Sequence, residues 1–288
     1  MRWYPTWAII VAVAALATGA LFLFAPKEKE PEPLPEAPKE TGMTKTIGTS
    51  VQGRAIEAFT YGTGDTQAVF VGGIHGGYEW NSVLLAYTLM DYLAATPSAI
   101  PPGVRITVIP NANPDGVFAV VKKEGRFQST DVPAGDHPLG RFNAHSVDLN
   151  RNFGCKWQAE ASWRGNKVSA GTAAFSEPEA QALRDFFLKE KPKAAVFFHS
   201  QAGAVYASEC EAGILPETLA IMNVYATAAA YPAVSVFDAY PVTGDVEGWL
   251  ASIDVPALSV EFNTHESMEW DKNKAGIEAL VQYLGNTR

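Results

Sequence analysis

Side chains of two types that bind metals lie at or near the ends of apolar segments. The segment VGGIHGGYEWNS (residues 71–82) places His75 between two glycine pairs and Glu79 four residues later. His199 lies near the end of the apolar run AAVFFHS, and Glu261 lies near the end of PALSVEF. Catalytic zinc takes three protein ligands of these types and keeps an open position for water. We therefore interpret His75, Glu79 and His199 as a candidate zinc triad, with Glu261 as a candidate base for the bound water.

Each of these residues also has an ordinary structural interpretation. A histidine at a strand end is commonly a hydrogen-bonded structural residue, and polar side chains on a glycine-rich turn commonly face water. A nucleotide-binding turn is a further alternative for FVGGIHGG. Its spacing, however, matches neither Gly-x-Gly-x-x-Gly nor the P-loop, and no lysine follows. The joint occurrence of the four residues favours a metallohydrolase.

The elements that would position these residues are strands alternating with helices. We predict strands at 55–62, 67–74, 104–111, 194–200 and 256–262, and helices at 81–95, 176–191, 215–231 and about 273–286. The helix at 176–191 opens with Ser-x-x-Glu, which indicates a capping box. This alternation predicts a single α/β domain with a mixed, largely parallel sheet flanked by helices. Since ligands collect beyond the carboxyl ends of such strands, His75, Asn111, His199 and Glu261 should lie together.

The amino-terminal part of the chain differs in composition from the rest. Residues 3–26 carry no charge, and TWAIIVAVAALATGALFLF (6–24) is about long enough to span a bilayer as a helix. A cleaved signal peptide is the alternative, but LFLFAP lacks its small-x-small site. We predict an anchor or signal segment at 1–26, a Pro/Glu-rich linker at 27–43 and a catalytic domain at 44–288. The lysines that follow the span leave its orientation open.

Composition limits the class of partner. Of the 288 residues, 47% are hydrophobic and 18% are charged, as in an ordinary globular protein. The net charge of −9 argues against a nucleic-acid partner, because nucleic acids attract basic surfaces.

Six motifs resemble, in order, those of the M14 family of zinc metallocarboxypeptidases, from about Thr44 to the C-terminus. They are GGIHGGYE (72–79), NPDG (113–116), GRFNAHSVDLNRNF (140–153), FSEPEAQAL (175–183), FFHSQAG (197–203) and LSVEF (258–262). The first has one residue more than the family's His-x-x-Glu motif, and a bulged turn is expected to absorb it. The resemblance implies a zinc carboxypeptidase fold, one Zn²⁺ per chain, and a peptide substrate with a free C-terminal carboxylate.

The resemblance also implies a role for each site residue. His75, Glu79 and His199 would bind zinc, and Glu261 would act as general base and later as proton donor. Asn150 and Arg151 would grip the terminal carboxylate, which suits a forked guanidinium. Arg141 would polarise the scissile carbonyl and stabilise the oxyanion. Tyr240 corresponds to the family's mobile tyrosine that covers the substrate; an ordinary loop aromatic is the alternative.

Specificity in this family comes from a pocket for the terminal side chain. By position, Glu247 corresponds to a residue of that pocket, with Asp245 nearby. An acid there would favour Lys, Arg or diaminopimelate; the alternative is a solvated loop charge. The remaining polar residues are expected to be structural or solvated: Asp148 to hold a turn, and His137, His145 and His265 to lie in surface loops. A place at the rim of the site is the alternative for His265, which lies four residues after Glu261.

The two cysteines have two interpretations. Cys155 and Cys210 are buried thiols if the domain lies in a reducing compartment and a disulfide if it does not. Given the resemblance, both follow site segments and should lie near the mouth of the site. A disulfide would then close a loop of about 55 residues, which is worth ~4 kcal/mol in the chain-entropy model.

More than one interpretation remains open for the cellular location of the protein and for the reaction that it catalyses. We predict a membrane-anchored protein with an extracytoplasmic catalytic domain, or a secreted form if the segment is cleaved. Cell-wall stem peptides and ordinary peptides are both compatible substrates. A zinc amidohydrolase of acyl-amino acids and an inactive module that binds peptide ends are the rival functions. The carboxylate-binding pair disfavours the first, and the intact ligands and base disfavour the second.

Overall fold

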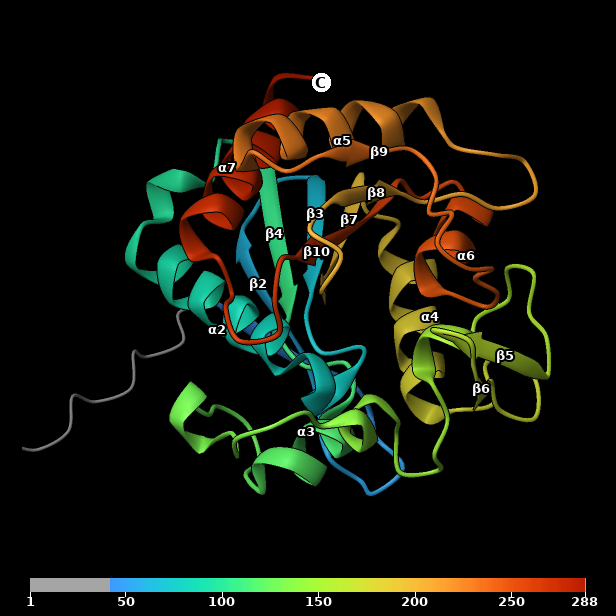
Figure 1. Ribbon diagram of the computed structural model, residues 1–288. Coiled ribbons are helices and arrows are strands. Elements are labelled where there is room, and N and C mark those ends of the chain that lie inside the picture. Colours follow the sequence, from blue (N-terminus) through green and yellow to red (C-terminus); the bar gives the residue numbers. More distant parts are fainter. Residues whose placement is uncertain (1–41, 288) are drawn as a thin grey trace, which may run out of the picture. The chain divides into compact units, whose positions relative to one another are not determined.

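The computed structural model describes residues 42–287 (Figure 1). The predicted anchor (1–26) and nearly all of the predicted linker (27–43) lie outside the described residues. Among the helices of residues 42–287, none combines the length and apolar character needed to cross a bilayer.

The centre of the domain is an eight-stranded mixed sheet in the order β1-β2-β4-β3-β7-β10-β8-β9. Strands β4, β3, β7 and β10 are parallel neighbours, whereas β1, β2 and β8 pair antiparallel with the strands inside them. This confirms the predicted mixed α/β sheet. The strands are β1 (Met43–Thr49), β2 (Ala55–Gly62), β3 (Thr66–Val71), β4 (Val104–Ile109), β7 (Ala194–Ser200), β8 (Val205–Ala207), β9 (Ala233–Val234) and β10 (Ala257–Phe262).

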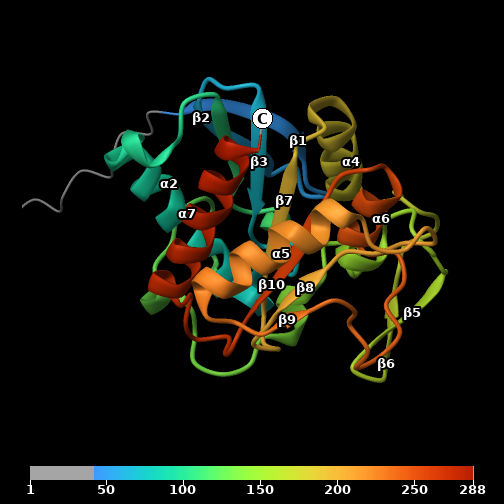
Figure 2. The ribbon, with the colours of Figure 1, turned by 90° about the horizontal axis from the view of Figure 1, so that it is seen from above.

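Helices cover both faces of the sheet (Figure 2). One face packs against α2 (Trp80–Ala95), α5 (Pro216–Ala229) and α7 (Trp270–Asn286). The other packs against α4 (Pro178–Glu190) and α6 (Val246–Ser252). Because both faces are covered, every residue of β7 is buried, which explains the unbroken apolar run that ends near His199.

The start of α4 differs from the predicted capping box. The N-cap is Glu177, not Ser176, and no side chain caps the helix. Pro178 occupies the first helical position, where its fixed φ is favourable and its missing N–H costs nothing. The Ser176 hydroxyl instead donates to Glu177 Oε1 (2.7 Å) and accepts from Asn152 Nδ2 (3.0 Å). Ser176 therefore braces the loop before the helix.

Short elements surround the carboxyl ends of the parallel strands. They are η1 (Gly76–Glu79), α3 (Pro114–Val121), η3 (Ser129–Asp131), η4 (Pro138–Arg141), η5 (Leu149–Arg151) and the hairpin β5 (Glu160–Trp163)–β6 (Asn166–Ser169). A further short element, η2 (Pro97–Ala99), follows α2 and precedes the start of β4. The NPDG motif starts α3, where the Asn113 side chain accepts from Gly116 N at 2.9 Å and donates to Arg141 O at 3.3 Å. This motif therefore has a structural role at the start of α3.

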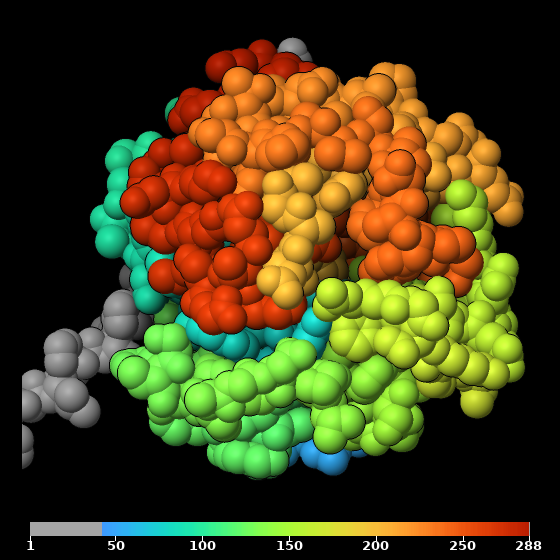
Figure 3. Space-filling model, viewed as in Figure 1, coloured from blue at the N-terminus to red at the C-terminus, as the bar shows by residue number. Residues whose placement is uncertain are grey.

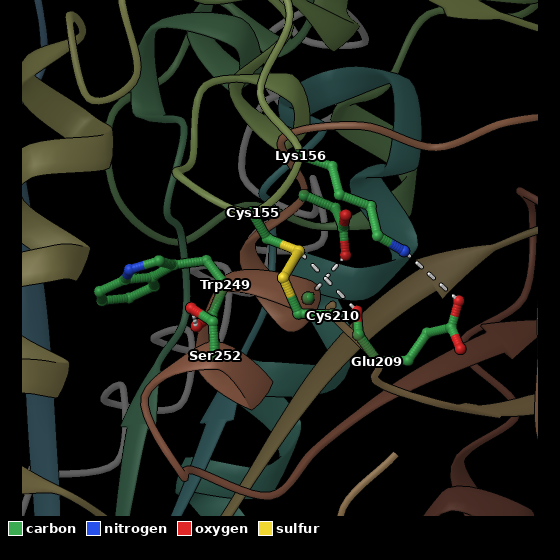
Figure 4. The surroundings of a disulfide bond; sticks show 8 residues. Cys155, Lys156, Glu209, Cys210, Trp249 and Ser252 are labelled. Carbon is green, nitrogen blue, oxygen red and sulfur yellow. Dashed lines mark hydrogen bonds and ion pairs between the residues drawn. A yellow bond between two sulfur atoms is a disulfide. The ribbon is translucent and has the colours of Figure 1, made fainter. Parts of the chain in front are cut away.

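A disulfide joins Cys155 to Cys210 (Figure 4). It ties the segment after η5 to the segment after β8, and both cysteines are buried. Next to it, Lys156 Nζ lies 3.7 Å from Glu209 Oε1 in an ion pair near the surface. The disulfide interpretation of the two cysteines is therefore the one that the structure supports.

We predict that the double substitution Cys155→Ala/Cys210→Ala lowers the free energy of unfolding by ~4 kcal/mol, because the unfolded chain regains the freedom of a 55-residue loop. Urea denaturation of the oxidised protein and of the variant measures the difference. The oxidised protein treated with a thiol reductant is the control and should unfold like the variant. Equal midpoints for all three samples would contradict the prediction.

Candidate active site

The turn that carries His75 and Glu79 is a 3₁₀ helix, not the first turn of an α-helix. After β3, residues 76–79 form η1, and α2 starts at the next residue. Gly76 has φ of +48°, and a Cβ there would lie 2.5 Å from Gly140 O. A Cβ at Gly77 would lie 2.6 Å from Val120 Cγ2. Because α3 and η4 approach so closely, glycine is required at both positions.

His75, Glu79 and His199 come together as a buried cluster. Their exposed fractions are 4%, 3% and 4%. One candidate ligand atom from each residue can be chosen so that all three lie within 4.8 Å of one another. His199 Nδ1 lies 3.1 Å from Glu79 Oε2, and the two imidazole rings are 5.1 Å apart between centroids. The structure thus unites the predicted zinc triad.

The cluster fits a zinc ion by two observations. His75 Nδ1 is buried and has no hydrogen-bond partner among the described residues; the carboxylate of Asp148 lies 3.6 Å away. A buried polar atom left without a partner costs about 1–3 kcal/mol. In addition, two nitrogens and one carboxylate oxygen form the donor set of several catalytic zinc sites. The described residues therefore offer what zinc requires.

Arg141 lies against this cluster and is held by Asp148. Its Nε donates to Asp148 Oδ2 at 2.8 Å, and its Nη1 lies 3.8 Å from Glu79 Oε1. The guanidinium carbon lies 4.5 Å from the centroid of the Trp163 ring. Asp148 also accepts from Asn150 N at 3.2 Å, so it holds its local turn as predicted. One fully buried carboxylate therefore orients Arg141 and starts η5.

The predicted carboxylate-binding residues follow directly in η5. Arg151 Nη1 donates to Asn150 O at 2.6 Å, and its Nε and Nη2 both donate to Ser162 O at 3.2 Å. The Asn150 side chain accepts from Val246 N (2.8 Å) and donates to Glu247 Oε2 (3.2 Å). Main-chain oxygens thus hold the guanidinium, and the start of α6 holds the amide.

Glu261 lies on β10 directly beside His199 on β7, in register. Its Oε2 accepts from Ala202 N at 3.2 Å. Burial raises the pKa of Glu261 to about 7, and the charge of Glu79 acts in the same direction. A carboxyl group whose pKa lies near the working pH suits general base catalysis.

Two acids stand at the start of α6. Asp245 is the N-cap and accepts from Gly248 N at 2.7 Å. Burial raises the pKa of Asp245 to about 6, with a contribution from the charge of Glu247.

Glu247, in the first turn of α6, is buried. Its Oε1 accepts hydrogen bonds from Ser259 Oγ (2.9 Å) and from His199 Nε2 (2.8 Å). Although burial raises the pKa of Glu247, the hydrogen bond from His199 brings it below its usual value. The alternative of a solvated loop charge is therefore wrong for Glu247.

The two histidines of the cluster have opposite electrostatic environments. Burial, with the nearby charge of Arg141, holds the pKa of His75 well below its usual value. Burial also acts to lower the pKa of His199, but the hydrogen bonds to Glu247 and Glu79 raise it well above the usual value. His75 therefore stays neutral at physiological pH, which is the form that binds a metal.

One cavity of about 710 Å³ contains nearly all of the predicted site residues. Figure 3 shows the face on which it opens, where the lime, gold and orange segments meet. Tyr240 lines it and packs on Phe237, with ring centroids 4.9 Å apart. From the predicted set, the lining residues are His75, Glu79, Arg141, Asn150, Arg151, Cys155, His199, Tyr240, Glu247 and Glu261. Asn111 was expected at the same place but borders a separate, smaller cavity beside Arg54.

Sequence reasoning missed an aromatic group at the mouth of the cavity. Tyr78 stacks edge to face on Trp163 (5.1 Å) and on His265 (4.5 Å). His265 is not the solvated residue that we expected, because Ser200 Oγ lies 2.7 Å from its Nδ1. Arg164, exposed at the tip of the β5–β6 hairpin, also lines the cavity. The only signal in the sequence was the Trp-Arg-Gly run within an otherwise polar loop.

Comparisons with known proteins agree with this geometry. The chain is 26% identical over 182 residues to gamma-D-glutamyl-L-diamino acid endopeptidase 1 of Lysinibacillus sphaericus, covering 56% of this chain and 46% of that protein. It is 27% identical over 176 residues to mouse carboxypeptidase M, covering 57% and 34%, respectively. The chain thus spans less than half the length of these curated relatives.

Solved structures share the fold. Murein-tripeptide amidase MpaA from Escherichia coli O157 superposes with a TM-score of 0.61 at 22% identity, covering 88% of this chain and 98% of that one. Carboxypeptidase A from Helicoverpa armigera superposes with a TM-score of 0.64 at 20% identity, covering 85% and 68%. The sequence profile described as Peptidase_M14, zinc carboxypeptidase, matches residues 36–263. By this match, which spans most of the sequence, the chain belongs to the M14 family of zinc carboxypeptidases.

Proposed function

We propose that this protein is a zinc metallocarboxypeptidase that releases the terminal residue of peptides with a free C-terminal carboxylate. The observation that carries the proposal is that one cavity brings the His75–Glu79–His199 cluster together with Glu261 and with Arg151. When bound, zinc would supply a Lewis acid and lower the pKa of its water. The residues of the chain provide the remaining functions.

Arg151 is suited to hold the substrate's terminal carboxylate. Its guanidinium has five N–H donors. Asn150 O and Ser162 O take three of them, and so fix the plane of the group. The remaining donors can pair with a carboxylate in the cavity, which places the last peptide bond at a set distance from the zinc cluster.

Arg141 and Glu261 are suited to the chemical step. Arg141 borders Glu79 and can donate to the oxygen that gains negative charge as the scissile bond is attacked. Glu261, with its pKa near 7, can take the proton of the attacking water and then give it to the leaving amine. Tyr240, at the rim of the cavity, can cover the bound peptide end.

The two acidic residues at the start of α6 favour a substrate whose C-terminal residue is basic or is a diamino acid. Asp245 and Glu247 both line the cavity beside Arg151. Negative charge there favours an ammonium or guanidinium on the terminal side chain. The names of a similar endopeptidase and of a murein-tripeptide amidase of the same fold point to cell-wall peptides. We therefore propose peptides that end in Lys, Arg or diaminopimelate, including cell-wall stem peptides.

We further propose that the domain lies outside the cytoplasm, anchored through residues 1–26. The Cys155–Cys210 disulfide supports this location, because structural disulfides persist mainly in oxidising compartments.

The decisive experiment is zinc analysis of the purified full-length chain together with a panel of peptides ending in Lys, Arg, Leu and diaminopimelate. We expect about one zinc per chain, as in catalytic sites of this type, and release of the C-terminal residue. Zinc without release from any peptide would favour an amidohydrolase of acyl-amino acids or a module that binds peptide ends. Absence of zinc would overturn the proposal.

We predict that Glu261→Gln retains zinc but lowers kcat by about 10²–10⁴, because the amide cannot accept the proton. Elemental analysis and steady-state kinetics on the best peptide of the panel measure the two effects. His199→Ala is the matched comparison, since it removes a zinc ligand and should lose the metal as well as the activity. Near-normal turnover of Glu261→Gln would remove this residue from the mechanism.

We predict that Asp245→Asn lowers the ratio of kcat/KM for C-terminal Lys over Leu, because it removes the charge while an asparagine still caps α6. In the unmodified protein the ratio should rise from pH 5 to pH 7, as Asp245, whose pKa is about 6, becomes charged. Since both peptides use the same catalytic groups, their common pH dependence cancels in the ratio. If Asp245→Asn leaves the Lys-over-Leu ratio unchanged, other residues of the cavity determine the selectivity.

A further inference from the structure

We propose that Glu247 is a positioning residue of the metal site, which holds the ring of His199 in the orientation that zinc requires. The inference rests on the proposed zinc site and goes beyond it. Glu247 Oε1 lies 2.8 Å from His199 Nε2, and the opposite ring nitrogen, Nδ1, lies 3.1 Å from Glu79 Oε2. The two nitrogens of one imidazole therefore face two different carboxylates.

This arrangement fixes which nitrogen is available to a metal. An ionised carboxylate can only accept a hydrogen bond, so Nε2 keeps its proton toward Glu247, and a bound zinc would take the place of the Nδ1 proton on the side of Glu79 and His75. A carboxylate on the far side of a ligating histidine also fixes the ring plane and raises the basicity of the ligand. Glu247 is placed to act on His199 in three ways: it sets which nitrogen keeps the proton, fixes the plane of the ring and raises the basicity of the ligating nitrogen.

Glu247 is itself held rigidly. Ser259 Oγ donates to Oε1 at 2.9 Å, and Asn150 Nδ2 donates to Oε2 at 3.2 Å. Its side chain is 4% exposed. Both carboxylate oxygens therefore have partners on the protein, which is expected of a brace and not of a group kept free for a substrate cation.

The other histidine of the cluster lacks a comparable contact. His75 Nδ1 has no hydrogen-bond partner among the described residues, and the Asp148 carboxylate is 3.6 Å away. Asp148 is engaged with Arg141 at 2.8 Å. The 2.8 Å contact between Glu247 and His199 is therefore shorter than the 3.6 Å approach of Asp148 to His75, and its loss should be felt in metal binding.

The test is the zinc affinity of Glu247→Ala and Glu247→Gln in the full-length chain, measured by competition with a chromogenic chelator. We expect a 10–100-fold loss of affinity for Glu247→Ala, the range typical of lost outer-shell partners. Glu247→Gln has nearly the same shape and an amide oxygen that still accepts from Nε2, so it should recover part of the loss.

Glu209→Gln is the matched control, because Glu209 also lines the cavity but pairs with Lys156 and has no contact with His199 among the described residues. Its zinc affinity should be unchanged.

The Tm of each metal-free protein shows whether the variant is folded. If Glu247→Ala does not fold, Ser259→Ala replaces it, because Ser259 donates a hydrogen bond to Glu247. Ser259→Ala should weaken zinc binding by a smaller factor than Glu247→Ala.

An unchanged zinc affinity in the Glu247 variants, with a fallen Lys-over-Leu ratio, would overturn the inference and make Glu247 a substrate-facing residue. Failure of the unmodified protein to bind zinc would instead overturn the proposed function, so the two failures are distinguishable. Absorption of the Co²⁺-substituted proteins gives a second readout: a changed ligand field in Glu247→Ala, but not in Glu209→Gln, supports the positioning role.

Discussion

Burying several carboxylates under one cavity is the constraint on which this site depends. An isolated buried carboxylate is costly, so each one must have a cation or hydrogen-bond donors beside it. Asp148, which is fully buried, has Arg141 and the backbone N–H of Asn150; Glu247 has His199 and Ser259. Glu79, between Arg141 and His199, completes a chain of alternating charge. Removing Arg141 would leave Asp148 without its cation, and removing His199 would leave Glu247 without its cation.

The sheet supplies the rigidity that this chain of charges requires. Strands β3, β7 and β10 are parallel neighbours, so their carboxyl ends deliver His75, His199 and Glu261 to one edge. Loops from distant parts of the sequence then supply the opposite charges, and the disulfide fixes one of these loops to the end of β8. Strands and loops therefore have different roles. The parallel strands, covered by helices on both faces, hold the candidate metal ligands in place, and the loops carry the groups proposed to contact the substrate.

The sequence predicts those features that local chemistry decides. Apolar runs located β2, β3, β4, β7 and β10, but not the edge strands β1, β8 and β9. Residue type identified His75, Glu79 and His199 as possible ligands of one metal, with Glu261 as the base beside it. It could not predict the N-cap of α4, because Pro178 and a hydrogen bond from Asn152 override the local Ser-x-x-Glu pattern. Likewise, contacts with Ser200 and Tyr78 move His265 from an expected solvated loop to the rim of the cavity. Contacts between distant segments decide these features.

Glu247 shows why position in a motif does not settle a role. Its place in the sequence predicted an acid that faces the substrate, and its place in the structure does border the cavity. Its oxygens, however, are shared among His199, Ser259 and Asn150. A carboxylate with these partners has part of its charge offset before any substrate arrives. Asp245, half-buried and with only backbone donors, is the acid whose charge remains available to a substrate cation. On the proposals above, the same short helix would separate two functions: Glu247 would position a metal ligand, and Asp245 would face the terminal side chain of the substrate.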